Sequence, residues 1–227
     1  MYVYLLVKAF LLTCNLHLYI SIVMSKIKNI IFDLGGVILN IDYHRTSEAF
    51  KKLGAVDFDI FYSQLGANKL FEDLETGHIT EIDFYNSMQQ HCSIGTTHQQ
   101  IQEAWNAILI NFRKESLEVL KDLKERYNIF LLSNTNSIHK TEFSKMYTVE
   151  TGQLNFDDFF VKAWYSHLLH LRKPYPSTYT HVLNEANLAA DETLFIDDSK
   201  VNIDGALEAG LKTHWLLPGE RIELLNL

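Results

Sequence analysis

After its first 26 residues, the chain alternates short apolar runs with longer stretches in which apolar residues recur at helical spacing. The apolar runs predict five strands, over residues 27–32, 129–132, 159–165, 193–196 and 213–217. The first run has no polar alternation after Asn29, which is typical of a strand buried on both faces of a parallel sheet. Helices are predicted over residues 116–126, 175–186 and 202–209. Strands that alternate with helices predict an α/β fold with a doubly wound, mostly parallel, Rossmann-like sheet.

Residues 45–110 interrupt this alternation. The stretch has a helical pattern punctuated by glycines at positions 54, 66, 77 and 95, and it contains few Val or Thr residues. It is too long for a loop in a compact domain. We therefore expect a small helical cap domain over residues 45–110, inserted into a core domain of residues 24–44 and 111–227.

Residues 1–23 are almost entirely apolar, and Lys8 is their only formal charge. The length is close to the roughly 20 apolar residues that span a bilayer. A membrane anchor, a signal peptide and an upstream extension of the reading frame remain open. A signal peptide lacks support because there is no basic start and no small-residue cleavage site. We favour an extension with Met24 as the natural start, and we expect membrane contact only if these residues are an anchor.

Composition and charge narrow the class of function. The chain has 227 residues, 47% of them hydrophobic, with 20 Lys and Arg against 28 Asp and Glu and a net charge of −8. An acidic chain without a basic run has no electrostatic footprint for nucleic acid. Cys14 and Cys92 have no metal-ligand spacing and form no disulfide framework, which fits a reducing compartment. We expect a cytoplasmic protein that does not bind nucleic acid.

Polar residues follow four of the predicted strands directly or in the next loop. In open α/β sheets, ligands bind at the carboxyl ends of the strands. The residues at these ends are Asp33, Ser133, Asn134, Lys173, Asp197 and Asp198. We expect them to meet at one edge of the sheet.

These residue types suit metal-assisted chemistry on a phosphate ester. Carboxylates suit Mg²⁺, which prefers oxygen ligands. The Ser133 hydroxyl and the backbone N–H groups of Leu34, Gly35 and Asn134 suit phosphate oxygens. A lysine beside a carboxylate keeps it ionised, and an ionised carboxylate can attack phosphorus.

The segments IIFDLGGVIL, LLSNT, LRKP and FIDDS resemble the four ordered motifs of the haloacid dehalogenase superfamily. The resemblance extends over residues 27–217. FEDLETGHITEIDF, AWNAILINFR and RKPYPSTYTHVL are similar to a subgroup of small capped sugar-phosphate phosphatases, which includes α-glucose-1-phosphate phosphatases. The resemblance implies a Mg²⁺-dependent phosphomonoesterase that acts on a small phosphorylated metabolite, and the resemblance to the subgroup favours a sugar phosphate.

The resemblance also implies a nucleophile and a metal site. Asp33 would form an aspartyl-phosphate. Its other carboxylate oxygen, the backbone carbonyl of Gly35 and the Asp198 carboxylate would hold Mg²⁺, with Asp197 beside them.

The remaining motif residues would bind and orient the phosphoryl group. Ser133 and the backbone amides of Leu34, Gly35 and Asn134 would contact its oxygens. Lys173 would orient the nucleophile and offset negative charge, and Asn202 would support the acidic pair.

One position departs from the family pattern. Family phosphatases usually carry a second Asp two residues after the nucleophile, where it protonates the leaving oxygen, and this chain has Gly35 there. Such general acid–base help is worth roughly 10²–10⁴-fold in rate. Asp42 and His44 are the candidates to replace it. Glu72 and Glu75 in the insert either face the substrate or lie on an exposed helix face, and we favour the exposed face.

Two other functions stay open at this point. A metal-independent carbon–halogen hydrolase would also lack the second Asp, but it would leave Asp197 and Asp198 unexplained. A catalytically weak protein that binds a metabolite or a protein partner is compatible with Gly35.

Overall fold

The computed structural model describes residues 27–62 and 69–227 of the chain. Five strands form one parallel sheet in the order β5-β4-β1-β6-β7. They are β1 (Asn29–Phe32), β4 (Asn128–Ser133), β5 (Lys162–Tyr165), β6 (Thr193–Asp197) and β7 (Lys212–Trp215). The chain runs outward from β1 to β5 on one side and then returns to build β6 and β7 on the other. This confirms the predicted doubly wound α/β fold.

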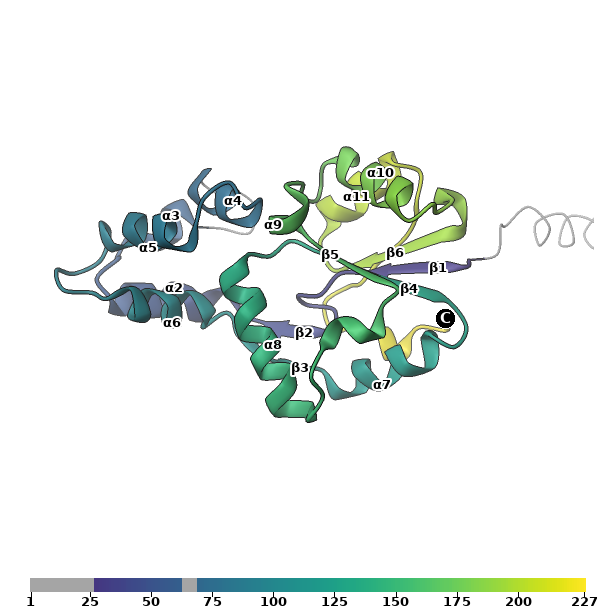
Figure 1. Cartoon of the computed structure of the whole chain (residues 1–227), viewed down its shortest axis with the longest axis horizontal. Helices are drawn as coiled ribbons and strands as arrows, with labels where there is room; N and C mark the ends of the chain where they lie inside the picture. The colour runs from purple at the N-terminus through teal and green to yellow at the C-terminus, as the bar shows by residue number, and fades with distance from the viewer. Residues whose placement is uncertain (1–26, 63–68) are drawn as a thin grey trace, which may run out of the picture.

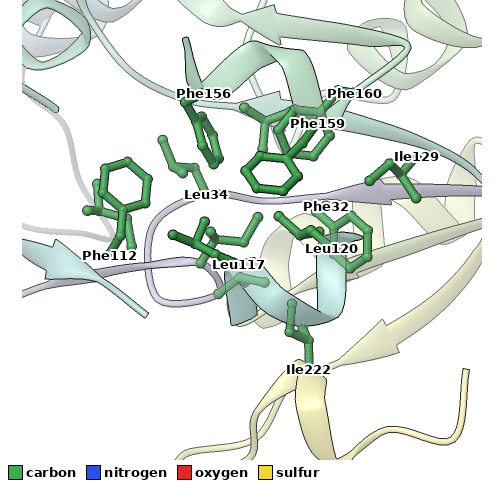
Figure 2. Close-up of a cluster of buried hydrophobic side chains, with 14 of the residues drawn as sticks. Phe32, Leu34, Phe112, Leu117, Leu120, Ile129, Phe156, Phe159, Phe160 and Ile222 are labelled. Atoms are coloured by element: carbon green, nitrogen blue, oxygen red, sulfur yellow. The ribbon is translucent and has the colours of Figure 1, made fainter. Parts of the chain in front are cut away.

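Different helices cover the two faces of the sheet (Figure 1). Successive side chains of a strand point to opposite faces, so neighbouring residues of β1 pack against different helices. Ile30 and Phe32 of β1 are buried with residues of α7 (Lys114–Leu123) and α8 (Ser137–Thr151). Figure 2 shows Leu117 and Leu120 of α7 turned toward Phe32. Ile31 points to the opposite face, which α10 (Pro176–Glu185) and α11 (Lys200–Glu208) cover. Burial on both faces explains why these strands are continuously apolar.

After β1, the chain forms a short strand, a group of helices and then a second short strand. β2 (Leu39–Ile41) and β3 (Leu109–Phe112) pair antiparallel and flank these helices. The helices are α2 (Tyr43–Lys52), α3 (Phe58–Phe61), α4 (Lys69–Glu75), α5 (Glu81–Gln89) and α6 (His98–Asn106). They gather at one end of the molecule, beyond the sheet (Figure 1). Their buried residues form a separate apolar cluster around Trp105 and Phe50, which Ile138 of α8 joins.

The sequence pattern gives no bounds for α8 and does not predict the β2–β3 pair. The buried stripe of α8 includes His139, Phe143 and Tyr147, and a pattern that counts His as polar does not detect it. Asn136 caps this helix by accepting a hydrogen bond from the backbone N–H of His139.

Strand β5 is shorter than the predicted strand over residues 159–165. The preceding residues form a short 3₁₀ helix, η1 (Phe156–Phe159), because Phe156, Phe159 and Phe160 pack into the core as a cluster rather than along a strand.

Residues 1–23 lie outside the described residues, so each interpretation of this segment stays a prediction. Within residues 27–62 and 69–227, no helix combines the length and apolar character needed to cross a membrane.

Candidate active site

The strand-end residues converge at one edge of the sheet, as the sequence predicts. Asp33 follows β1 directly, Ser133 ends β4, and Asp197 ends β6. Because β4, β1 and β6 are neighbours in the sheet, their carboxyl ends lie side by side. Lys173 reaches the same place from the loop after α9 (Ser166–Leu169).

Lys173 joins two of the carboxylates. Its Nζ lies 2.7 Å from Asp33 Oδ1 and 2.7 Å from Asp197 Oδ2, and its side chain is only 1% exposed. Burial lowers the pKa of Lys173, but attraction to Asp197 and Asp33 outweighs it, so the pKa is raised overall. Lys173 is therefore a fixed positive charge beside Asp33.

Asp197 is held by its neighbours on both carboxylate oxygens. Oδ1 accepts hydrogen bonds from the backbone N–H of Ser199 at 2.8 Å and from Asn202 Nδ2 at 3.1 Å. Oδ2 accepts from Asn202 Nδ2 at 3.0 Å and from Lys173 Nζ. The structure thus brings Asn202 to the acidic pair, and it gives Asp197 an evident part in orienting Lys173.

Three carboxylates form a compact acidic cluster. One oxygen from each of Asp33, Asp197 and Asp198 lies within 4.8 Å of the other two. Burial, only partly offset by Lys173, raises the pKa of Asp33 to about 7. Burial and repulsion by Asp197 raise the pKa of Asp198 to about 6. Carboxylates crowded with a single lysine fit a hard divalent cation, which relieves their repulsion.

Backbone N–H groups and Ser133 lie beside the acidic cluster. Ser133 is buried at the end of β4. Within the described part of the chain, the backbone N–H groups of Leu34, Gly35 and Asn134 donate no backbone hydrogen bond. The Asn134 side chain is used differently: its Nδ2 donates to the Lys173 carbonyl at 2.9 Å, and its Oδ1 accepts from the Lys173 N–H at 3.0 Å. Asn134 therefore fixes the lysine loop while its backbone amide stays available to an anion.

Comparison with known proteins agrees with this geometry. A family model described as haloacid dehalogenase-like hydrolase matches residues 27–210. The chain belongs to the haloacid dehalogenase-like hydrolase family. This confirms the resemblance carried by the four motifs and the expectation that the protein is an enzyme.

Similar proteins within this family cover most of the chain. A D-ribitol-5-phosphate phosphatase from Bacteroides thetaiotaomicron is 31% identical over 188 residues, which are 82% of this chain and 90% of the relative. A mutant family enzyme from the same organism, solved in complex with magnesium and inorganic phosphate, has a TM-score of 0.81 at 32% identity and covers 86% of this chain and 96% of its own. A predicted family hydrolase from Porphyromonas gingivalis has a TM-score of 0.76 at 29% identity, covering 84% and 91%.

The loop after Asp33 of this haloacid dehalogenase-like hydrolase needs glycine at residue 36. Gly36 has a φ of 72°, in the left-handed region, and an added Cβ would overlap Asp198 Oδ2. The absence of a side chain therefore lets Asp198 approach the loop that follows Asp33.

We expect Gly36→Ala to reduce both stability and activity. Left-handed backbone costs a non-glycine residue about 1–2 kcal/mol, and displacement of Asp198 should lower activity by about 10–100-fold. Gly152→Ala is a matched control, because Gly152 also has a φ of 72° and an added Cβ would meet nothing within 4 Å. Thermal melts should shift similarly for the two variants, whereas only Gly36→Ala should lose activity. Equal activity in both variants would contradict this role for Gly36.

A cavity of about 440 Å³ opens beside the acidic cluster of the hydrolase. Asp33, Gly35, Asn134, Lys173 and Asp198 line one part of it. Its other walls come from the helical segment and from residues on either side of Lys173, and include Tyr43, Tyr62, Glu72, Glu75, Arg172 and Tyr175. The expectation that Glu72 and Glu75 lie on an exposed helix face is therefore wrong.

Asp42 and His44 do not line this cavity. The Asp42 side chain caps α2, where it accepts a hydrogen bond from the His44 N–H at 2.9 Å. His44 is exposed. Sequence reasoning placed both near the site because they follow the first motif closely, but it is Tyr43, between them in the chain, that lines the cavity.

Proposed function

We propose that the protein is a Mg²⁺-dependent phosphomonoesterase that acts on a small sugar or polyol phosphate through an aspartyl-phosphate intermediate. The single observation that carries this proposal is Lys173, buried between Asp33 and Asp197, with Asp198 in the same carboxylate cluster. The named activity of the B. thetaiotaomicron phosphatase and the magnesium and phosphate in the related structure support it. A carbon–halogen hydrolase needs no metal, so that function would not explain the acidic cluster.

The arrangement suggests the following chemistry. An Asp33 oxygen attacks phosphorus, the bond to the ester oxygen breaks, and the alcohol leaves with its electron pair and takes up a proton. Water then attacks the phosphorus of the aspartyl-phosphate, which releases inorganic phosphate and restores the carboxylate. Lys173 and the backbone amides of Leu34, Gly35 and Asn134 offset charge that develops on the phosphoryl oxygens.

Mg²⁺ would be held by Asp33, the Gly35 carbonyl and Asp198, with Asp197 beside them. When bound, the ion supplies positive charge for the phosphoryl group. The direct contacts of Asp197 to Ser199, Asn202 and Lys173 favour a supporting role for it at this site.

We also propose that the helical segment within residues 45–110 is a cap over the active site. Its residues Tyr62, Glu72 and Glu75 line the same cavity as Asp33. A cap of this kind excludes water from the reacting groups and contacts the part of the substrate that does not react.

Gly35 has no side chain, so residue 35 cannot donate a proton to the ester oxygen that leaves. We expect turnover to depend on how readily the alcohol departs, so aryl phosphates and sugar 1-phosphates should react faster than plain alkyl phosphates. The hemiacetal oxygen of a sugar 1-phosphate belongs to a more acidic alcohol, which makes it the better leaving group.

Gly35→Asp should narrow the gap between aryl and alkyl phosphates by about 10²-fold, at the lower end of general acid–base contributions. An added Cβ would lie 2.9 Å from Ile41 Cδ1, the end of a flexible side chain. The double variant Gly35→Asp, Ile41→Val removes that methyl group, and Ile41→Val alone is its control. Values of kcat/KM across a leaving-group series, with a Mg²⁺ titration for each variant, measure the effect. An unchanged series at normal Mg²⁺ affinity would show that another group already donates the proton.

A screen of phosphorylated metabolites tests the proposed function directly. It should include D-ribitol 5-phosphate and α-glucose 1-phosphate, with and without Mg²⁺. Mg²⁺-dependent release of phosphate from members of this class is the expected result. No release from any phosphate ester would contradict the proposal.

A further inference from the structure

Glu75 and Arg172 form an ion pair across the active-site cavity. Glu75 ends α4 in the helical segment, and Arg172 precedes Lys173 in the loop from the sheet. Arg172 Nη2 lies 3.2 Å from Glu75 Oε2, with side-chain exposures of 18% and 25%. Both residues line the cavity that contains Asp33 and Asp198. Glu75 also lines a smaller adjoining cavity beside Ser133.

The pair leaves polar atoms unsatisfied. Glu75 Oε2 is in ion-pair contact with Arg172 Nη2, but within the described part of the chain neither Glu75 Oε2 nor Arg172 Nε makes a hydrogen bond, and both atoms are enclosed. Burial raises the pKa of Glu75, although Arg172 opposes the shift. Buried polar groups without hydrogen bonds are rare in folded proteins, and in a binding cavity a ligand or an ordered water can complete them.

Glu75 is held in place by the contacts around it. The carbonyl of the next residue, Thr76, lies 2.8 Å from His170 Nδ1. An added Cβ at Gly77 would overlap the His167 carbonyl, so the turn after α4 packs directly against the segment that contains α9. A carboxylate on a fixed turn is suited to selecting among ligands, because it does not have to be ordered when one binds.

The walls near Glu75 are aromatic and acidic. Tyr43, Tyr62 and Tyr175 line the cavity, and Glu72 adds a second carboxylate. Aromatic rings pack against the C–H groups of a carbon chain, and a carboxylate accepts hydrogen bonds from several hydroxyl groups. The same two carboxylates disfavour a second anionic group on the substrate.

We propose that Glu75 is a specificity-determining residue that accepts hydrogen bonds from the hydroxyl groups of a polyol or sugar phosphate, and that Arg172 is the positioning residue that orients it. This inference rests on the proposed phosphatase function, which it deepens by assigning the hydroxyl-recognising group.

Two esters that differ in their hydroxyl groups test the proposal. D-Ribitol 5-phosphate and n-pentyl phosphate have the same chain length and both release a primary alcohol, so the effect of Gly35 is shared. The wild-type kcat/KM should favour the ribitol ester by about tenfold or more, as expected for hydrogen bonds to a charged group. Glu75→Gln should reduce that preference at least about fivefold, mainly through the KM of the ribitol ester. Glu103→Gln, an exposed change on α6, should keep the preference.

The positioning role of Arg172 is tested by comparing the ester preference of two variants. Arg172→Gln should lower the ribitol preference through KM, and Arg172→Lys should restore part of it because a positive charge remains beside Glu75. Thermal melts check that each variant is folded. A purely structural role would instead lower kcat/KM for both esters equally in both variants.

The outcomes separate this inference from the proposed function. If the wild type hydrolyses both esters equally well, or if folded Glu75→Gln keeps the full preference, the inference is overturned while the phosphatase function stands. If the wild type hydrolyses neither ester nor any aryl phosphate in Mg²⁺, the proposed function fails, and the inference fails with it.

Discussion

Asp33→Asn should abolish phosphate-ester hydrolysis, with kcat falling by about 10⁴-fold or more. An amide is not a nucleophile, and within the described chain the other carboxylates of the cluster are Asp197, held on both oxygens, and Asp198. The variant should remain folded, because the change removes one negative charge from a crowded cluster while leaving its shape. Steady-state hydrolysis of an aryl phosphate measures the loss, and circular dichroism confirms the fold.

Asp42→Asn is the matched control for this prediction. It makes the same chemical change nine residues later, at a helix cap where Asn and Asp are about equally good. Its activity should equal that of the wild type. Trapping by beryllium fluoride should succeed in the control and fail in Asp33→Asn. More than trace turnover by folded Asp33→Asn would overturn the covalent mechanism.

Removal of divalent cations with EDTA should reduce kcat by about 10³-fold or more, and Mg²⁺ should restore it. A bound metal supplies several kcal/mol of charge stabilisation in a transition state, and each 1.36 kcal/mol is tenfold in rate. The crowding of Asp33, Asp197 and Asp198 around one lysine is the structural reason. Activity assays after dialysis against EDTA, followed by a Mg²⁺ titration, measure the effect.

Thermal melts provide a second readout that does not require turnover. At 100 times its Kd, Mg²⁺ should stabilise the folded protein by about 2.7 kcal/mol. Asp198→Asn should lose this stabilisation, and Asp204→Asn should keep it, because Asp204 is an exposed residue of α11 paired with Lys200. Full turnover in EDTA would favour the metal-independent carbon–halogen hydrolase instead.

The sheet and the cluster of polar residues at its edge were predictable because each signal is local. A continuously apolar run such as residues 193–196 indicates a buried strand, and Asp197 and Asp198 follow it immediately. The rule that parallel strands expose their carboxyl ends at one edge then brings distant motifs together. The contact of Lys173 with Asp33 joins residues 140 positions apart and follows from that rule.

The cavity walls could not be predicted in the same way. Glu75 lies on a helix whose pattern fits an exposed face, and its position depends on how α4 packs against the loop containing Arg172. The β2–β3 pair depends on contacts between residues that are far apart in the chain, such as Asn40 and Asn111. Its two strands are only three and four residues long, which is too short for a clear sequence pattern. The assignments of roles to Ser133, Leu34 and Gly35 stay predictions until variants are assayed.

The antiparallel pairing of β2 and β3 places the two ends of the helical segment next to each other, since Ile41 is the partner of Leu109. The chain therefore enters and leaves the helical segment at one place, the β2–β3 pair. The helices of this segment form a separate apolar cluster, which Ile138 of α8 joins. Insertions of this kind are tolerated because their two ends lie close together. The cavity walls and the carboxylate cluster of this chain can therefore evolve separately in large part. Changes in α2–α6 alter the walls, whereas Lys173 is held by Asp33 and Asp197 of the core, and Arg172 links the two parts through Glu75.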